Sequence, residues 1–155
     1  PLADICVARA GGRTADLPEA RPRKVIPQRN ATLLVLLDGK RVLLETRPPA
    51  GVWGGLLSLP ELPDGDDARQ CSETRFACRV STVTTVPALD HAFSHFRLHI
   101  SPLLLQVVPD SAAMEPGLQW LDLADTATAA LPAPIRRILD NIQTSGSKPL
   151  LSRKR

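Results

Sequence analysis

Two short runs rich in leucine and valine, separated by a turn sequence, constrain the fold of this chain more than any other feature. Residues 31–37 read ATLLVLL, residues 40–46 read KRVLLET, and Asp38-Gly39 lies between them. An Asp-Gly pair between β-prone runs is a strong signal for a type I′ hairpin, whose two central residues need positive φ. We therefore expect an antiparallel hairpin here.

The remaining elements follow from hydrophobic periodicity and turn residues. We expect a loop stiffened by prolines and freed by glycines over 47–55, a strand over 56–59, a helix from Asp66 or Asp67 to about 80, strands over 81–93, 96–108 and 118–123, and a helix over 132–142. Strands outnumber helices in this order. The fold class predicted is α/β (α+β), a mixed β-sheet with helices packed on its faces.

Charge divides the chain into three parts. Residues 8–29 carry six basic side chains against two acidic ones and no apolar period, which is typical of a basic linker. Residues 144–155 carry four basic side chains and no acidic one, and we expect a basic, flexible tail. Residues 30–143 hold nine basic side chains against thirteen acidic ones. The expected folded domain is therefore acidic, so any attraction to nucleic-acid phosphates cannot come from its bulk charge.

Composition excludes several classes of protein. The chain has no run of about 18 apolar residues and no basic, then apolar, amino-terminal pattern, so we expect a soluble intracellular protein without a membrane partner. Its three cysteines, Cys6, Cys71 and Cys78, are too few for a disulfide framework and match no zinc-ribbon spacing. Cys71 and Cys78 are expected to be buried thiols.

The segment after the hairpin is similar to the signature of Nudix hydrolases. Gly55, Glu61 and Arg69 keep the family spacing Gly-x5-Glu-x7-Arg, after which that family places three carboxylates that hold magnesium against a pyrophosphate. Here those positions read Gln70, Glu73 and Thr74. One carboxylate with an amide and a hydroxyl is a poor cage for a hard divalent ion, so the sequence predicts a Nudix-like scaffold without Nudix chemistry.

All three histidines lie in the stretch HAFSHFRLHI, residues 91–100. On one continuous strand His91, His95 and His99 share a face, yet residues four apart lie roughly 13 Å from each other, too far for one metal ion. The same geometry would turn Ser94 toward apolar neighbours. A role for Ser94 at the surface therefore requires a turn between two strands at 93–96. His91 and His99 are equally well explained as surface or structural residues.

Three stretches together resemble the carboxy-terminal part of MutY-type, A/G-specific adenine DNA glycosylases. They are RPPAGVWGGLLSLPE, HAFSHFRLHI and LPAPIRRIL, in the order of that family, and they span most of residues 30–142. The resemblance implies that residues 30–143 form a Nudix-like domain that recognises 8-oxoguanine opposite adenine in DNA. It assigns the contact with the oxidised base to Ser94 first, then Phe93 and His95. The supporting loop is Arg47, Trp53, Gly54 and Gly55, although Trp53 is also explained as core and the two glycines as a tight turn.

The amino end fits the same resemblance. That family holds a [4Fe-4S] cluster with four cysteines, and the opening PLADIC places Cys6 as the fourth ligand, with residues 1–7 as a remnant of the cluster loop. One thiolate cannot hold a cluster, so we expect no cofactor in this chain alone. The catalytic domain that cleaves the glycosidic bond would then lie outside the chain, and the fragment by itself is expected to be inactive. Cys6 as an incidental thiol is the alternative.

The expected partners are double-stranded DNA with an 8-oxoguanine:adenine mispair and the missing catalytic domain, with the chain itself a monomer. The abundance of Arg, Ala and Pro suggests a bacterial source, and hence a cytoplasmic, nucleoid-associated protein. Two other functions stay open. The first is that of an active Nudix pyrophosphohydrolase that acts on oxidised nucleotides. The second is that of a protein-interaction module that uses its basic linker.

Overall fold

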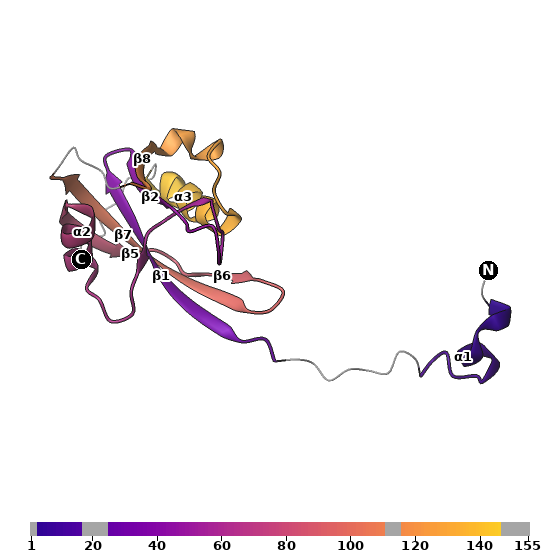
Figure 1. Cartoon of the computed structure of the whole chain (residues 1–155). Helices are drawn as coiled ribbons and strands as arrows, with labels where there is room; N and C mark the ends of the chain where they lie inside the picture. The colour runs from indigo at the N-terminus through magenta and orange to yellow at the C-terminus, as the bar shows by residue number, and fades with distance from the viewer. Residues whose placement is uncertain (1–2, 17–24, 111–115, 147–155) are drawn as a thin grey trace, which may run out of the picture.

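A single mixed sheet organises the molecule, which is described here from a computed structural model covering residues 3–16, 25–110 and 116–146. The path of neighbouring strands is β3-β2-β1-β7-β5, with β4 paired to β1, β6 to β7 and β8 to β2 (Figure 1). The strands are β1 (Gln28–Asp38), β2 (Arg41–Thr46), β3 (Leu57–Ser58), β4 (Glu61–Leu62), β5 (Cys78–Thr85), β6 (Leu89–Ala92), β7 (Arg97–Pro109) and β8 (Leu118–Asp122). Strands β1 and β7 run parallel, and every other pair is antiparallel.

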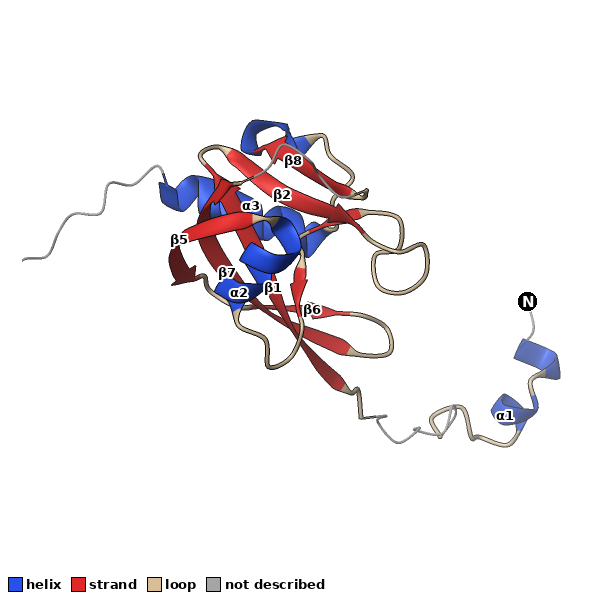
Figure 2. Ribbon diagram, turned by 60° about the vertical axis from the view of Figure 1, so that its left-hand side comes forward, coloured by secondary structure: helices blue, strands red, loops and turns tan. Residues whose placement is uncertain are grey.

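Helices cover both faces of this sheet, as the sequence predicts (Figure 2). Helix α3 (Ala133–Gly146) packs Ile135, Ile138 and Leu139 against the odd-numbered side chains of β1, and helix α2 (Ala68–Phe76) packs Cys71 and Phe76 against the even-numbered ones. Alternation along β1 thus feeds two hydrophobic layers. The expected mixed sheet with a helix on each face is confirmed.

The β1–β2 hairpin is confirmed, but its turn lies one residue later than predicted. Asp38 pairs with Arg41, so Gly39 and Lys40 are the two central residues. Gly39 has φ +60°, whereas Lys40 is not among the described residues with positive φ. This pattern belongs to a type II′ turn, which needs glycine at its first central position, rather than to type I′. The ion pair between Arg41 and Asp38 closes the turn.

Two other local predictions gain detail. Asp67 rather than Asp66 caps α2, because its carboxylate accepts a hydrogen bond of 2.9 Å from the backbone N–H of Gln70. The helix ends at Phe76 rather than near residue 80, because Ala77 adopts a left-handed backbone with φ +47°.

The strand expected over 81–93 is two strands, β5 and β6, separated by residues 86–88. The gap explains why Pro102 is tolerated inside β7. Strand β5 ends its pairing at Leu103 and β6 begins at Ile100, so the missing N–H of Pro102 lies where β7 has no strand on that side.

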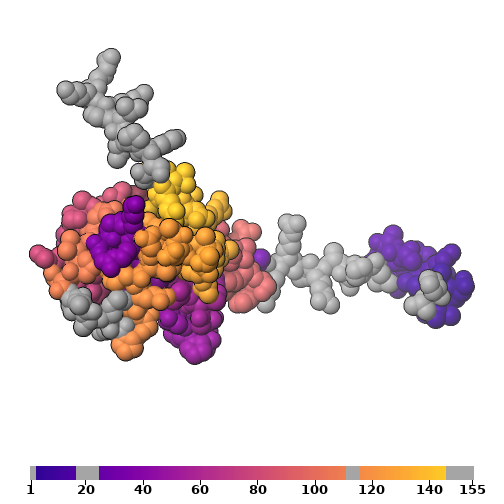
Figure 3. All heavy atoms as spheres, turned by 90° about the horizontal axis from the view of Figure 1, so that it is seen from above, coloured from indigo at the N-terminus to yellow at the C-terminus, as the bar shows by residue number. Residues whose placement is uncertain are grey.

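The ends of the folded body differ from the predicted boundaries. Strand β1 starts at Gln28, two residues inside the predicted linker, and α3 continues through Gly146, where Thr144 Oγ1 donates to the carbonyl of Asp140. A 3-10 turn η1 (Ala3–Ile5) and helix α1 (Val7–Ala10) occupy part of the amino-terminal segment, which Figure 3 shows apart from the body. Residues 1–2 and 17–24 of the predicted cluster loop and linker, and 147–155 of the predicted tail, lie outside the described residues.

A second 3-10 turn, η2 (Leu123–Ala127), connects β8 to the segment before α3. The guanidinium of Arg136 donates to backbone carbonyls of Thr126 and Ala129, at 3.1 and 2.9 Å, and so ties α3 to this connection. Within the described residues, no helix is both long and apolar enough to cross a membrane.

Candidate functional site

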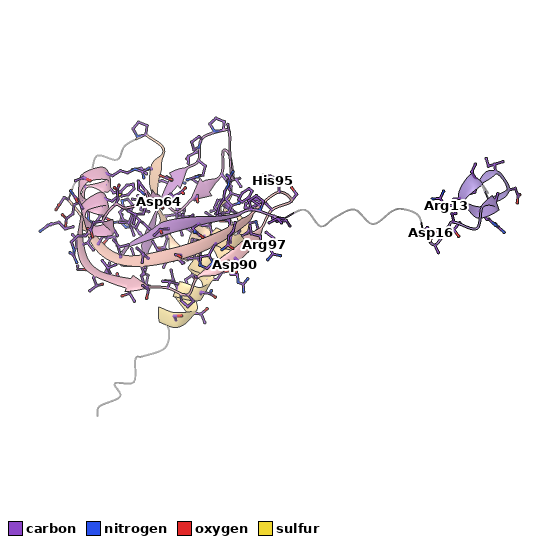
Figure 4. The ribbon with its side chains drawn as sticks, turned by 90° about the horizontal axis from the view of Figure 1, so that it is seen from below. Arg13, Asp16, Asp64, Asp90, His95 and Arg97 are labelled. Atoms are coloured by element: carbon purple, nitrogen blue, oxygen red, sulfur yellow. The ribbon has the colours of Figure 1, made fainter. Side chains whose placement is uncertain are left out.

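The stretch around Ser94 forms the tip of the β6–β7 hairpin. Ala92 pairs with Arg97, and the backbone N–H of Phe93 donates to the carbonyl of Phe96 at 2.8 Å, so the chain reverses at Ser94 and His95. The turn required by the sequence argument is therefore present. Both residues at the reversal are exposed, and Figure 4 shows His95 at this end of the sheet. The side chain of Ser94 faces solvent and not the core.

Among the described residues, the hydroxyl of Ser94 has one hydrogen-bond partner. Its Oγ lies 3.1 Å from Nδ1 of His95. In the neutral tautomer that carries its proton on Nε2, Nδ1 accepts the hydroxyl hydrogen of Ser94. The lone pairs of the serine oxygen then stay open to an incoming donor.

Aromatic rings support the tip from below. The rings of Phe93 and Phe96 stack at 4.4 Å with an interplanar angle of 19°, and His91 meets Phe93 edge-on at 4.7 Å. Trp53 lies 6.1 Å from Phe93 and 6.2 Å from His91. Phe96 belongs to the buried core on the α3 side, and Trp53 and Phe93 pack against that core. Of the residues predicted to read the base, Phe93 therefore acts as a support, and Ser94 and His95 are presented outward.

The turn also changes the placement of the histidines. Because the chain reverses, His91 lies on the α3 side of the sheet, whereas His99 bonds Asp90 Oδ1 at 2.7 Å on the other side. The face that the three histidines would share on one continuous strand is therefore absent. A metal site of three histidines is excluded by this geometry as well as by distance.

The supporting loop between β2 and β3 is held by unusual backbone geometry. A Cβ atom on Gly54 would lie 2.3 Å from the carbonyl oxygen of Pro49, so only glycine fits there. Trp53 and Gly55 have φ values of +59° and +74°. The N–H of Gly55 donates to the carbonyl of Arg47 at 3.2 Å, which folds the loop back and places the Trp53 ring beside Phe93. The predicted loop residues are thus brought together beneath the tip.

A cavity of about 210 Å³ lies between this loop and the start of β1. Its walls include Trp53, Phe96 and Asn30, and also Arg47 and Ser58, whose Nε and Oγ atoms are fully buried and have no hydrogen-bond partner among the described residues. A buried polar group without a partner costs about 1–3 kcal/mol. The aromatic rings give the cavity flat walls that suit a small planar ligand, whereas the two buried atoms are closed off from its space. Neither Ser58 nor the cavity was predicted from the sequence, because the loop and the sheet that enclose it are distant in the chain.

In the described structure, no hydrogen bond or ion pair joins Glu61, Arg69 and Glu73 of the Nudix signature to one another. Glu61 on β4 pairs with Arg47 at 3.3 Å, and Arg69 donates to the carbonyl of Val80. Three further positions, Gln70, Glu73 and Thr74, are exposed on α2, and Thr74 Oγ1 bonds back to the carbonyl of Gln70 at 2.8 Å. Arg75 reaches instead to Glu45 Oε2 at 2.7 Å. Glu45 and Glu61 are thus both paired with arginines.

The described residues contain no group of three or more His, Cys, Asp or Glu side chains placed to hold a metal ion. Cys6 lies directly before α1, while Cys71 and Cys78 are buried in the α2-side core. Burial raises the pKa of both core thiols. The three cysteines therefore cannot form a four-thiolate cluster among themselves, and Cys6 as one ligand of a cluster completed outside this chain stays a prediction.

Fold and sequence together define the class. Residues 31–141 match the Nudix domain family, which is more than two thirds of the chain, and the chain belongs to that family. The sequence is also 23% identical over 145 residues to the adenine DNA glycosylase of Buchnera aphidicola subsp. Acyrthosiphon pisum, and 22% identical over 143 residues to that of Buchnera aphidicola subsp. Schizaphis graminum. These alignments cover 92% and 90% of this chain and 41% of each relative, so the chain spans about two fifths of their length. The resemblance expected from the sequence is confirmed.

Solved structures agree on the fold. The C-terminal domain of mouse MUTYH, solved in complex with human PCNA, superposes with a TM-score of 0.57 at 16% identity, over 77% of this chain and 90% of that one. The MutT protein of Methanosarcina mazei Go1 gives 0.60 at 13% identity, over 81% and 100%. At these identities the likeness shows the Nudix fold alone.

Proposed function

We propose that this chain is the lesion-recognition domain of an adenine DNA glycosylase, and that Ser94 reads 8-oxoguanine opposite adenine. The similarity to adenine DNA glycosylases supports the DNA-repair role. The single observation that carries the reading role is the exposed hydroxyl of Ser94 at the tip of the β6–β7 hairpin. Catalysis belongs, on this proposal, to a domain outside the chain.

The chemistry of the damaged base suits a hydrogen-bond acceptor. Guanine presents N7 as an acceptor on its major-groove edge, whereas 8-oxoguanine carries a hydrogen on N7 and an oxygen at C8. When His95 accepts the hydroxyl hydrogen of Ser94, the serine oxygen offers lone pairs to that N7–H. The N7 of guanine carries a lone pair and no hydrogen, so its contact with the same oxygen would be repulsive. Ser94 and His95 together therefore favour the oxidised base.

Substituting the serine tests this role. We expect Ser94→Ala to reduce the preference of the chain for duplexes with 8-oxoguanine:adenine over guanine:adenine by about tenfold to a hundredfold, the 1–3 kcal/mol of one base-edge contact. His95→Ala should reduce it in the same direction, because the freed hydroxyl can rotate and donate to the N7 of guanine. Fluorescence anisotropy with both duplexes measures the ratio.

Ser145→Ala is the matched control, since Ser145 is an exposed serine on α3 without a hydrogen-bond partner in the described structure. It should leave the ratio unchanged. A ratio for Ser94→Ala equal to that of Ser145→Ala would refute the reading role.

The cavity beside the tip favours a second candidate, the binding and hydrolysis of an oxidised nucleotide. Its flat walls, formed by Trp53 and Phe96, suit a purine. Hydrolysis needs a magnesium cage, however, and Glu61 is bound to Arg47 while Gln70 and Thr74 supply no carboxylate. Robust pyrophosphate release from oxidised guanosine triphosphate with magnesium would establish this activity, and lesion recognition predicts none.

A further inference from the structure

Most arginines of the folded body already have partners. Arg41, Arg47, Arg75 and Arg79 pair with carboxylates, and Arg69 and Arg136 donate to backbone carbonyls. Within residues 25–110 and 116–146, four basic side chains have neither kind of partner, namely Arg29, Lys40, Arg97 and Arg137. Since residues 30–143 carry more acidic than basic groups, these four are the cations free to attract a polyanion.

Two of the four flank the tip that carries Ser94. Arg97 is the first residue of β7 and pairs with Gln28 across the parallel β1–β7 ladder, next to the pairing of Arg29 with Leu98. Figure 4 shows Arg97 and His95 at the same end of the sheet. The four residues 93–96 extend beyond this first pairing with β1.

The two arginines lie on opposite faces of the sheet. The guanidinium of Arg29 lies over the ring of Phe96, 4.8 Å from its centroid, and Phe96 and Leu98 belong to the α3-side core. Because side chains alternate along a strand, Arg97 projects on the α2 side. An unpaired cation therefore stands on each side of the hairpin tip. Asp90, the acidic residue of β6, is bound to His99 on that same side at 2.7 Å.

A groove of duplex DNA presents phosphates in the same arrangement. A purine in the anti conformation turns its N7 edge to the major groove, which is about 12 Å wide and admits a two-stranded β-ribbon. A sheet with its side chains is about 10 Å thick, so a tip that reaches N7 has one sugar–phosphate strand facing each of its sides. We propose that the β6–β7 tip enters the major groove with Arg29 bound to phosphates of one strand and Arg97 to phosphates of the other. This inference rests on the proposed function, because the base contact of Ser94 fixes the groove.

The salt dependence of binding tests the two phosphate contacts. The binding constant falls as salt rises, and each lost phosphate contact should make the slope of log K against log salt concentration less steep by about 0.9. We expect this change for Arg29→Gln and for Arg97→Gln, with equal weakening on lesion and undamaged duplexes, and a normal slope for Arg97→Lys, which keeps the charge. Lys40→Gln is the matched control. It removes an unpaired cation at the far end of β1, roughly 33 Å from the tip at about 3.3 Å per residue.

Neutral methylphosphonate linkages then assign the strands. Placed on one strand beside the lesion, they should abolish the effect of Arg29→Gln and leave that of Arg97→Gln intact, and placed on the other strand they should do the reverse. Coupling of both arginines to the same strand would overturn the groove geometry. Slopes for Arg29→Gln and Arg97→Gln that match Lys40→Gln would overturn the phosphate contacts.

The outcome separates this inference from the proposed function. One outcome is that Arg29→Gln and Arg97→Gln have less steep salt slopes while Ser94→Ala keeps the lesion preference. This outcome would support the arginine contacts and refute the reading role of the serine. The other outcome is that Arg29→Gln and Arg97→Gln keep the normal salt slope while Ser94→Ala reduces the lesion preference. It would support the reading role of the serine and refute the arginine contacts.

Discussion

At the scale of single residues, Gly54 determines where the supporting loop can lie. The carbonyl oxygen of Pro49 occupies the space that any Cβ atom at this position would need. The close approach brings the Trp53 ring to Phe93, directly beneath the tip of the β6–β7 hairpin. Gly54 is distant from Ser94 in the sequence, yet it helps to set the position of Ser94 in the structure.

Substituting the neighbouring glycines separates steric clash from backbone strain. Gly54→Ala must displace backbone atoms of Pro49, whereas Gly55→Ala meets nothing within 4 Å and pays only for its left-handed φ of +74°. That strain costs roughly 1–2 kcal/mol. We expect Gly54→Ala to lower the free energy of unfolding by more than Gly55→Ala, as measured by urea denaturation. Equal losses would show that the loop can open without cost.

Other residues of the site differ in how far the sequence predicted them. Ser94 and His95 were found because a resemblance pointed to them, and the turn they need was deduced from strand alternation. Arg29 was assigned to the linker, because nothing local shows that β1 begins at Gln28 and lies beside β7. Ser58 gave no signal either, since its unpartnered hydroxyl exists only once the loop encloses the cavity.

At the scale of elements, local chemistry predicted most helices and strands. The β1–β2 hairpin, the cap of α2 and the start of α3 all follow from turn and capping residues that lie within a few positions of each other. The errors arise where pairing with a partner strand decides the outcome. The break between β5 and β6 and the one-residue shift of the β1–β2 turn depend on pairing with β7 and on register, which short-range patterns do not specify.

The cap of α2 provides a prediction at this scale. Asp67 accepts a hydrogen bond from the backbone of Gln70, whereas Asp66 is an exposed neighbour with no such bond. Asp67→Ala should lower the free energy of unfolding by about 1 kcal/mol, the usual contribution of an N-cap. Asp66→Ala removes the same charge one position earlier and should cost only a few tenths. Thermal denaturation of the two variants gives the comparison, and equal shifts in Tm would assign the effect to charge and not to the cap.

At the scale of the whole molecule, the parallel pairing of β1 with β7 is the feature that sequence patterns could not supply. It joins residues about 70 positions apart and places Arg29 and Arg97 at one end of the sheet. The two hydrophobic layers follow from it, because β1 and β7 alternate in step and feed the α3 side and the α2 side together. The mixed sheet was predicted as a class, and its strand order was not.

Burial of two thiols in the α2-side layer makes stability depend on pH. Burial raises the pKa of Cys71 and Cys78, so the folded protein keeps their protons after the unfolded chain has lost them. Their contribution is complete below about pH 8.5 and is lost as the pH rises, by up to about 1.4 kcal/mol per pH unit for each thiol. The chain has no tyrosine, so no phenol titrates in the same range. Urea denaturation between pH 8 and 10 measures the slope.

Alanine variants identify the source of this slope. The double variant Cys71→Ala and Cys78→Ala should lose most of the fall in stability above about pH 8.5. Cys6→Ala should keep it, because Cys6 lies outside the folded core. A slope that survives in the double variant would exclude the core thiols as its origin.

The ring of Phe96 is shared by two environments, since it fills the α3-side core at 3% exposure and also carries Phe93 on one side and Arg29 above it. The packing of the interior and the position of the hairpin tip therefore cannot change independently of each other during evolution. A substitution that repacks the interior beneath this ring would also move the hairpin tip, and a substitution at the tip would change the packing of the interior.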